Sequence, residues 1–298
     1  MTLRMTLALL LIIPAAMTYP WQSVHHRVLL GVAATAVVIL FARWRGSFVT
    51  TLIGRRAAVW RRNRKGPKPA AVERVSVVLK VHAGQDDVLP LPELAGYLQR
   101  YGMRCDSVRV ISRDEDGHRD TWVSLVVDAA PNLAALQARS SDLPLAEVAQ
   151  VLGRRVAEFL RERGLQVSVD DNAEAPLRAD AREGWRAVRD DAGHLTGYLL
   201  AADAVADALA ELRSDTELWT MLEFSGAATD PVVAAACAVR TAERPASAAV
   251  AGLVAAPGLQ LPLLAAMDPQ SVSRLPIAGA VPPAGLTWSV GAAEAAVS

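Results

Sequence analysis

The chain has 298 residues, 52% of them hydrophobic, and its 31 Lys and Arg residues are balanced by 31 Asp and Glu residues. This zero net charge hides a division, because the cations gather near the N-terminus and leave the remainder net acidic. The two cysteines, Cys105 and Cys237, lie far apart without metal-ligand spacing. That spacing excludes a cysteine-based metal site and predicts two reduced packing residues.

Two apolar runs open the chain, separated by a short turn that contains Pro and Trp. They predict a transmembrane hairpin over residues 1–45, with helices at about 3–19 and 27–44. The first run is short for a spanning helix, which needs at least ~17 mostly apolar residues. A cleaved signal peptide with a small-residue site at 14–16 is therefore the alternative.

A basic juxtamembrane arm and linker, residues 46–70, follows the hairpin, and residues 43–68 contain no acid. Because cytoplasmic flanks carry the excess of Lys and Arg, the bulk of the chain is expected in the cytoplasm of a bacterium, below a multi-pass anchor in the inner membrane. Residues 46–65 predict an amphipathic helix at the inner leaflet, where arginines attract anionic lipid head groups. Nucleic-acid binding is not expected, because no interleaving of aromatic and basic residues follows in the body of the chain.

The candidate contact residues belong to the hairpin and the arm. Small residues in the second apolar helix allow a neighbouring helix to approach closely. The basic stretch 55–65 is suited to lipid head groups or to acidic surfaces on partners. The candidates are Gly31, Ala34, Trp44, Arg55, Arg56, Trp60, Arg61, Arg62, Arg64 and Lys65.

The remainder, residues 71–298, predicts a cytosolic α+β domain. Its first part alternates strand and helix patterns in the order β-α-β-β-α-β, which is the order of a ferredoxin-like split unit. The clearest helix has one apolar stripe that ends before a glycine. The expected elements are strands at 72–81, 105–111, 121–127 and 165–169 and helices at 92–101 and 145–160.

A second copy of this unit is predicted downstream, which gives two subunits at 71–175 and 180–298. The stretch 234–256 is rich in alanine, so a helix is the alternative there. The expected strands are 184–189, 194–200, 217–224, 232–239, 277–281 and 286–290, and the expected helices are 204–212 and 268–274, the latter opened by Asp268 and Pro269.

Motifs for chemistry are sparse in this sequence. It has neither a Gly-rich phosphate loop nor histidines at metal-ligand spacing. The D-x-D formed by Asp114 and Asp116 is the one motif of interest, because such carboxylates hold a divalent metal in some transferases. A membrane-tethered metal-dependent glycosyl- or nucleotidyl-transferase is therefore the alternative function, and a solvated hairpin tip is the structural alternative. No cofactor, no resident metal and no catalytic activity are expected.

The order of a two-helix hairpin, a basic arm and an α+β body without catalytic motifs resembles the EccE component of the type VII (ESX) secretion system. The resemblance covers the whole chain and includes the wording Met17-Thr18-Tyr19-Pro20-Trp21 and Trp44-Arg45-Gly46. The short chain resembles the EccE of the system for iron and zinc acquisition. The resemblance implies a structural subunit of an inner-membrane complex with EccB, the ATPase EccC and EccD, in several copies, without enzymatic activity of its own.

Overall fold

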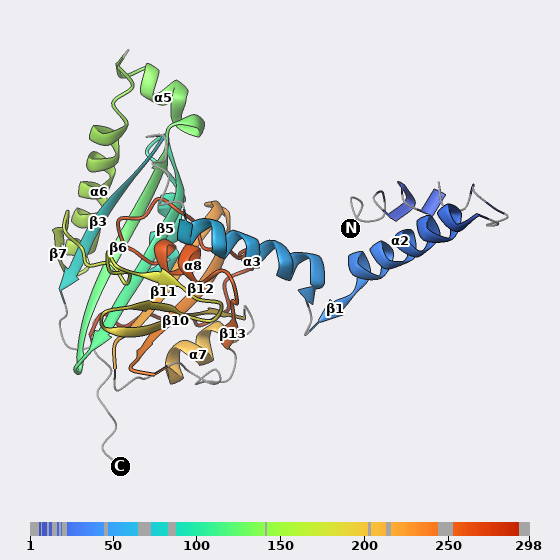
Figure 1. Ribbon diagram of the computed structural model, residues 1–298. Helices are drawn as coiled ribbons and strands as arrows, with labels where there is room; N and C mark the ends of the chain where they lie inside the picture. The colour runs from blue at the N-terminus through green and yellow to red at the C-terminus, as the bar shows by residue number, and fades with distance from the viewer. Residues whose placement is uncertain are drawn as a thin grey trace. The chain divides into compact units, whose positions relative to one another are not determined.

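The computed structural model describes residues 6, 8–10, 12–13, 17, 19, 23–44, 47–64, 73–82, 88–140, 142–201, 204–212, 216–243 and 253–291. The chain divides into two compact units, Met1–Arg64 and Lys65–Ser298 (Figure 1).

In the continuously described part of the N-terminal unit, from residue 23 onward, a small ribbon joins two helices. Helix α2 covers Val24–Phe41 and helix α3 covers Val49–Arg64. Between them β1 (Arg43–Trp44) pairs antiparallel with β2 (Ser47–Phe48). The helix predicted at 27–44 begins earlier, at Val24. It also ends earlier, at Phe41, because Arg43 and Trp44 pair in the ribbon. Within the described part of the chain no helix is both long enough and apolar enough to cross a membrane, and much of the predicted helix 3–19 lies outside it.

The first half of the C-terminal unit matches the predicted order of elements. Its strands β7, β3, β6 and β5 lie side by side in that order and each pair is antiparallel. This is the strand order that a β-α-β-β-α-β unit produces. The elements are β3 (Arg74–His82), α4 (Leu91–Ala95), η1 (Gly96–Leu98), β4 (Gln99–Arg100), β5 (Met103–Glu115), β6 (His118–Asp128), η2 (Ala130–Asn132), α5 (Leu133–Gln137), α6 (Leu145–Glu162) and β7 (Gln166–Val169).

The second half continues the same sheet in the order β11, β12, β10, β9, β8, and β13 also pairs with β10. The helix alternative for 234–256 is wrong, because residues 234–241 lie in β12 and residues 253–255 form β13. The elements are β8 (Arg182–Glu183), β9 (Val188–Asp190), β10 (Gly193–Leu200), α7 (Val205–Glu211), β11 (Leu218–Ala227), β12 (Asp230–Thr241), β13 (Leu253–Ala255) and α8 (Gln260–Ala266).

Four elements predicted in this half are wrong. The strand expected at 184–189 is interrupted by a turn, which the N–H of Gly184 closes by donating to the carbonyl of Ala187. The helix expected at 268–274 is absent, because the Asp268 carboxylate accepts a hydrogen bond from the Gln270 N–H and forms a turn.

The strands expected at 277–281 and 286–290 are reduced to two isolated bridges, Val233 with Ala280 and Val88 with Ser289. Prolines at 276, 282 and 283 explain the loss, because proline supplies no N–H for a strand ladder.

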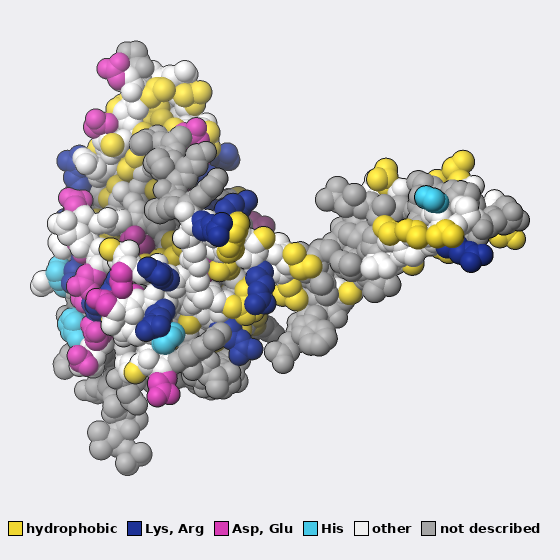
Figure 2. Space-filling model, in the orientation of Figure 1, with side chains coloured by type: hydrophobic (Ala, Val, Ile, Leu, Met, Phe, Trp, Pro, Cys, Tyr) yellow, Lys and Arg dark blue, Asp and Glu magenta, His cyan; other side chains and the backbone are white. Residues whose placement is uncertain are grey.

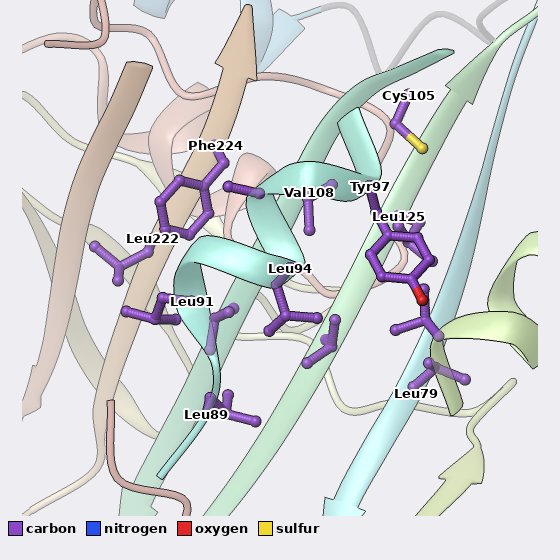
Figure 3. Close-up of a cluster of buried hydrophobic side chains, with 14 of the residues drawn as sticks. Leu79, Leu89, Leu91, Leu94, Tyr97, Cys105, Val108, Leu125, Leu222 and Phe224 are labelled. Atoms are coloured by element: carbon purple, nitrogen blue, oxygen red, sulfur yellow. The ribbon is translucent and has the colours of Figure 1, made fainter. Parts of the chain in front are cut away.

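The two halves join where β5 pairs with β11. The pairing is antiparallel and runs from Val108 opposite Phe224 to Asp114 opposite Leu218. Helix α4 and η1 cover this junction on one face: Figure 3 shows Leu91, Leu94 and Tyr97 among side chains from β5, β6 and β11. One continuous apolar core thus packs across the junction and includes residues from both halves.

Helix α6 packs on the same face and follows its sequence pattern closely. Its buried residues include Val148, Leu152, Val156 and Leu160, which recur at helical spacing. Gly164, with φ +91°, follows the helix and supplies the left-handed conformation that ends it. The opposite face of the sheet is covered by α8 and by residues around Met267 and Leu275, which form a second apolar cluster.

Candidate interaction surface

Helix α3 carries the basic residues predicted to make contacts. Its sequence contains Arg55, Arg56, Arg61, Arg62 and Arg64 and no acidic residue. Arg56, Arg61 and Arg64 are exposed, and Arg55 and Arg62 are half-buried. Because five cations share one 16-residue helix, α3 has a strongly positive potential that is suited to anionic partners.

Large apolar side chains accompany these cations. Ile53 and Trp60 are 59% and 60% exposed, and seven residues separate them, so they lie on one side of α3. The guanidinium carbon of Arg64 lies 3.9 Å from the centre of the Trp60 ring, a cation–π arrangement. Figure 2 shows yellow and dark-blue side chains together along this helix. The predicted contact residue Lys65 lies outside the described residues.

Helix α2 presents the predicted small residues. Gly31 and Ala34 are exposed, and a Cβ added to Gly31 meets nothing within 4 Å. The Thr35 hydroxyl donates to the Gly31 carbonyl at 2.8 Å, which satisfies that hydroxyl inside its own helix. Trp44, also predicted, lies in β1. The structure therefore brings the small residues and the arginines onto successive helices of one unit.

The D-x-D motif has a structural role at the β5–β6 hairpin. Asp114 accepts two hydrogen bonds from Arg119, at 2.6 Å from Nε and 2.8 Å from Nη2. Asp116 and Gly117 form the turn with φ angles of 52° and 76°. Among the residues the structure describes, no group of three His, Cys, Asp or Glu side chains is placed to hold a metal ion. The geometry therefore favours the hairpin-tip interpretation, since both Asp114 oxygens are already bound.

Neither cysteine is placed for nucleophilic chemistry. Cys105 and Cys237 are free and buried, and burial raises the pKa of each thiol to about 12. Because the thiolate is the reactive form, both side chains are inert at neutral pH. The prediction that they are reduced packing residues agrees with their burial in the first apolar core.

Buried ion pairs are a feature that the sequence interpretation missed. Arg109 lies fully buried on the second face and pairs with Glu223 at 3.0 Å. Its Nη1 and Nη2 each donate to a carbonyl oxygen at 2.5 Å, those of Ser271 and Ser273. Burial lowers the pKa of Arg109 and raises that of Glu223, although each charge supports the other. This pair anchors the segment around residue 272 onto the sheet.

A second buried pair lies near the sheet end. Arg240 binds Glu217 through Nε and Asp190 through Nη1 at 2.7 Å. Burial lowers the pKa of Arg240, but the hydrogen bonds to Asp190 and Glu217 outweigh burial and raise it. The sequence signal was weak, because only Glu223 is the single charged residue of its strand, whereas the strand of Arg109 holds several others.

The family model and the curated relatives that this chain matches are all EccE proteins of ESX secretion systems. The family described as "Putative type VII ESX secretion system translocon, EccE" matches residues 116–200, which run from the β5–β6 turn through β10. The ESX-3 secretion system protein EccE3 of Mycolicibacterium smegmatis is 45% identical over 282 residues, which cover 92% of this chain and 90% of that protein. EccE3 of Mycobacterium tuberculosis (strain CDC 1551 / Oshkosh) is 46% identical over 285 residues, with 91% and 86% covered. The ESX-2 secretion system protein EccE2 of that strain is 26% identical over 242 residues, with 62% and 44% covered.

Proposed function

This chain belongs to the EccE family of type VII (ESX) secretion proteins, and on that premise we propose that it is a non-catalytic structural subunit of an ESX-3 secretion complex. The observation that carries the proposal is the similarity to EccE3 proteins along nearly the whole chain. The ESX-3 assignment also agrees with the resemblance to the version for iron and zinc acquisition.

The proposed role is to stabilise the assembly that EccB, the ATPase EccC and EccD form in the inner membrane for protein export, with several copies in each complex. Two features of the body support a structural role. Asp114 is held in an ion pair with Arg119, and the two thiols are buried. The body is also built on one large sheet, and interaction sites on strands are held more precisely than sites on loops.

The proposed attachment to the membrane is the N-terminal unit, with the bulk of the chain in the cytoplasm. Residues 1–45 are proposed to anchor the chain as a hairpin, and α3 is proposed to lie at the inner leaflet among anionic lipid head groups. The support for α3 is its set of five arginines together with exposed Trp60 and Ile53, a composition typical of interfacial helices.

A pull-down of the full chain, tagged after Ser298 and extracted in mild detergent, tests the subunit role. We expect EccB, EccC and EccD to co-purify in a fixed ratio, and the purified chain to turn over no nucleotide sugar. The matched variants are D114N/D116N, which should leave assembly and secretion unchanged, and a chain lacking residues 1–45, which should leave the membrane fraction in high salt because only α3 still binds lipid. Recovery of the full chain alone contradicts the proposal. A metal-dependent activity of the unsubstituted chain that D114N/D116N abolishes together with secretion also contradicts it.

A further inference from the structure

Basic side chains lie directly opposite one another at one end of the sheet. Strand pairing puts Arg182 of β8 opposite Arg189 of β9 and, on the next strand, Arg189 opposite His194 of β10. Opposite residues of an antiparallel pair project to the same face with Cβ atoms about 5 Å apart. These three residues therefore form one row across three strands, which we name the arginine ladder.

The arginine ladder lowers the stability of the folded chain when no partner is bound. Like charges in directly opposite positions repel each other and destabilise a sheet. Both arginines are exposed, and within the described structure neither side chain forms a hydrogen bond or ion pair. Arg186, in the turn between the two strands, is also exposed and adds a third cation.

The nearby acids do not neutralise this row. Asp190 is buried against Arg240, and Asp191 pairs with Arg178 at 3.2 Å. Glu183 is buried and accepts a hydrogen bond from the Leu261 N–H. The exposed Asp180 and Glu243 form no ion pair with the ladder. The fold thus holds two guanidinium groups together, and no acid among the described residues forms an ion pair with either of them.

We propose that the arginine ladder is a docking site for a carboxylate-rich segment of a partner protein. The planar guanidinium group binds carboxylates through two parallel hydrogen bonds, and two such groups on paired strands present a rigid row of donors. Binding of carboxylates converts the repulsion between Arg182 and Arg189 into attraction toward a shared partner.

The surroundings favour a protein over a membrane or a nucleic acid. Membrane-surface sites combine cations with exposed large apolar residues, as α3 does with Trp60. Between residues 170 and 253, the described part of the chain has no exposed large hydrophobic side chain. Sites for single-stranded nucleic acid require exposed aromatic rings for stacking, and the ladder has none. Charge complementarity to carboxylates is what remains.

The proposal extends beyond the role of the chain as a subunit, and its test uses the purified full chain in non-ionic detergent. The variants are R182Q and R189Q, with R154Q on the exposed side of α6 as the matched control. We expect both ladder variants to raise Tm at low salt and to lose this gain at high salt, because salt screens the repulsion. R154Q should leave Tm unchanged.

Binding of a fluorescent decaglutamate peptide, followed by anisotropy, provides the second readout. All variants carry R55Q/R56Q/R61Q/R62Q/R64Q, so that the arginines of α3 do not mask the ladder. We expect R182Q/R189Q to weaken binding about tenfold or more, as loss of charge-assisted hydrogen bonds predicts, and R154Q to have no effect.

Three results overturn the proposal. The first is unchanged Tm in both ladder variants, and the second is that R182Q/R189Q weakens peptide binding no more than R154Q does. The third is ladder-dependent binding to phosphatidylglycerol vesicles without binding to decaglutamate, which would assign the site to a membrane. None of these readouts depends on assembly with EccB, EccC or EccD, so failure here is distinguishable from failure of the subunit role.

Discussion

Arg109 and Glu223 occupy directly opposite positions on β5 and β11, the same relation that joins Arg182 to Arg189 at the sheet end. The first pair has opposite charges and is buried, whereas the second has like charges and is exposed. Identical backbone geometry thus serves stability in one place and, in our proposal, recognition in the other. The partner across the strand and the burial of the pair together decide which role an arginine has.

Replacement of Arg109 tests the buried pair. R109M leaves the Glu223 carboxylate buried without its main partner, so we expect the free energy of unfolding to fall by about 3–5 kcal/mol. R109M/E223L removes both charges and should recover part of that loss. Urea denaturation of the full chain in detergent measures both effects.

The exposed R154M is the control for this experiment and should change the unfolding free energy by less than about 0.5 kcal/mol. If R109M behaves like R154M, the buried pair does not hold the segment around residue 272 on the sheet.

Helix α6 approaches the sheet at a glycine. A Cβ added to Gly153 collides with Cγ1 of Val77 on β3, and both residues are buried. The apolar stripe of α6 was sufficient to predict the helix, because its spacing repeats along the sequence. The close approach was not predictable, because Val77 is distant in the sequence from the helix that it contacts.

The G153A substitution tests this packing. Alanine favours a helix over glycine by up to ~1 kcal/mol, whereas a forced shift of a packed helix costs about 1–3 kcal/mol. Because Val77 is buried and β3 is paired on both edges, we expect a net loss of about 1–2 kcal/mol in the free energy of unfolding. Thermal unfolding followed by circular dichroism measures this.

Gly96 provides the matched control. It has φ −59° at the end of α4, and a Cβ there meets nothing within 4 Å. We expect G96A to be neutral or to stabilise the chain by about 0.4–1 kcal/mol through the unfolded state. A stabilising G153A would show that α6 lies farther from β3 than in this structure.

The whole C-terminal unit is built on one sheet. Strands from both sequence halves are neighbours at the β5–β11 junction, and Trp122 from one half stacks on Trp219 from the other, with ring centres 5.9 Å apart. The first apolar core also contains residues from both halves. Continuous pairing and a shared core couple the halves in one folding unit.

This coupling predicts a single unfolding transition for Lys65–Ser298. We expect L125A in the first half and L195A in the second, both fully buried, to lower the same midpoint by an amount that corresponds to about 2–5 kcal/mol. Calorimetry of the full chain in detergent provides the measurement. Two transitions, each moved by only one variant, would show that the halves fold independently.

The sequence by itself determined the class of the fold and most of its first half, since alternating strand residues and the α6 stripe are local patterns that burial on one face imposes. It failed near the C-terminus, where proline and the turn at Asp268 replaced the expected closing elements.

The tertiary structure alone decided which strands meet. The junction of β5 with β11, the burial of Arg109 against Glu223 and the opposition of Arg182 to Arg189 all depend on register between distant segments. Register is set by the shared core and by the turns that join the strands, not by any single segment. Strand pairing therefore decides which charged side chains lie together, whereas the sequence alone decides which side chains are available.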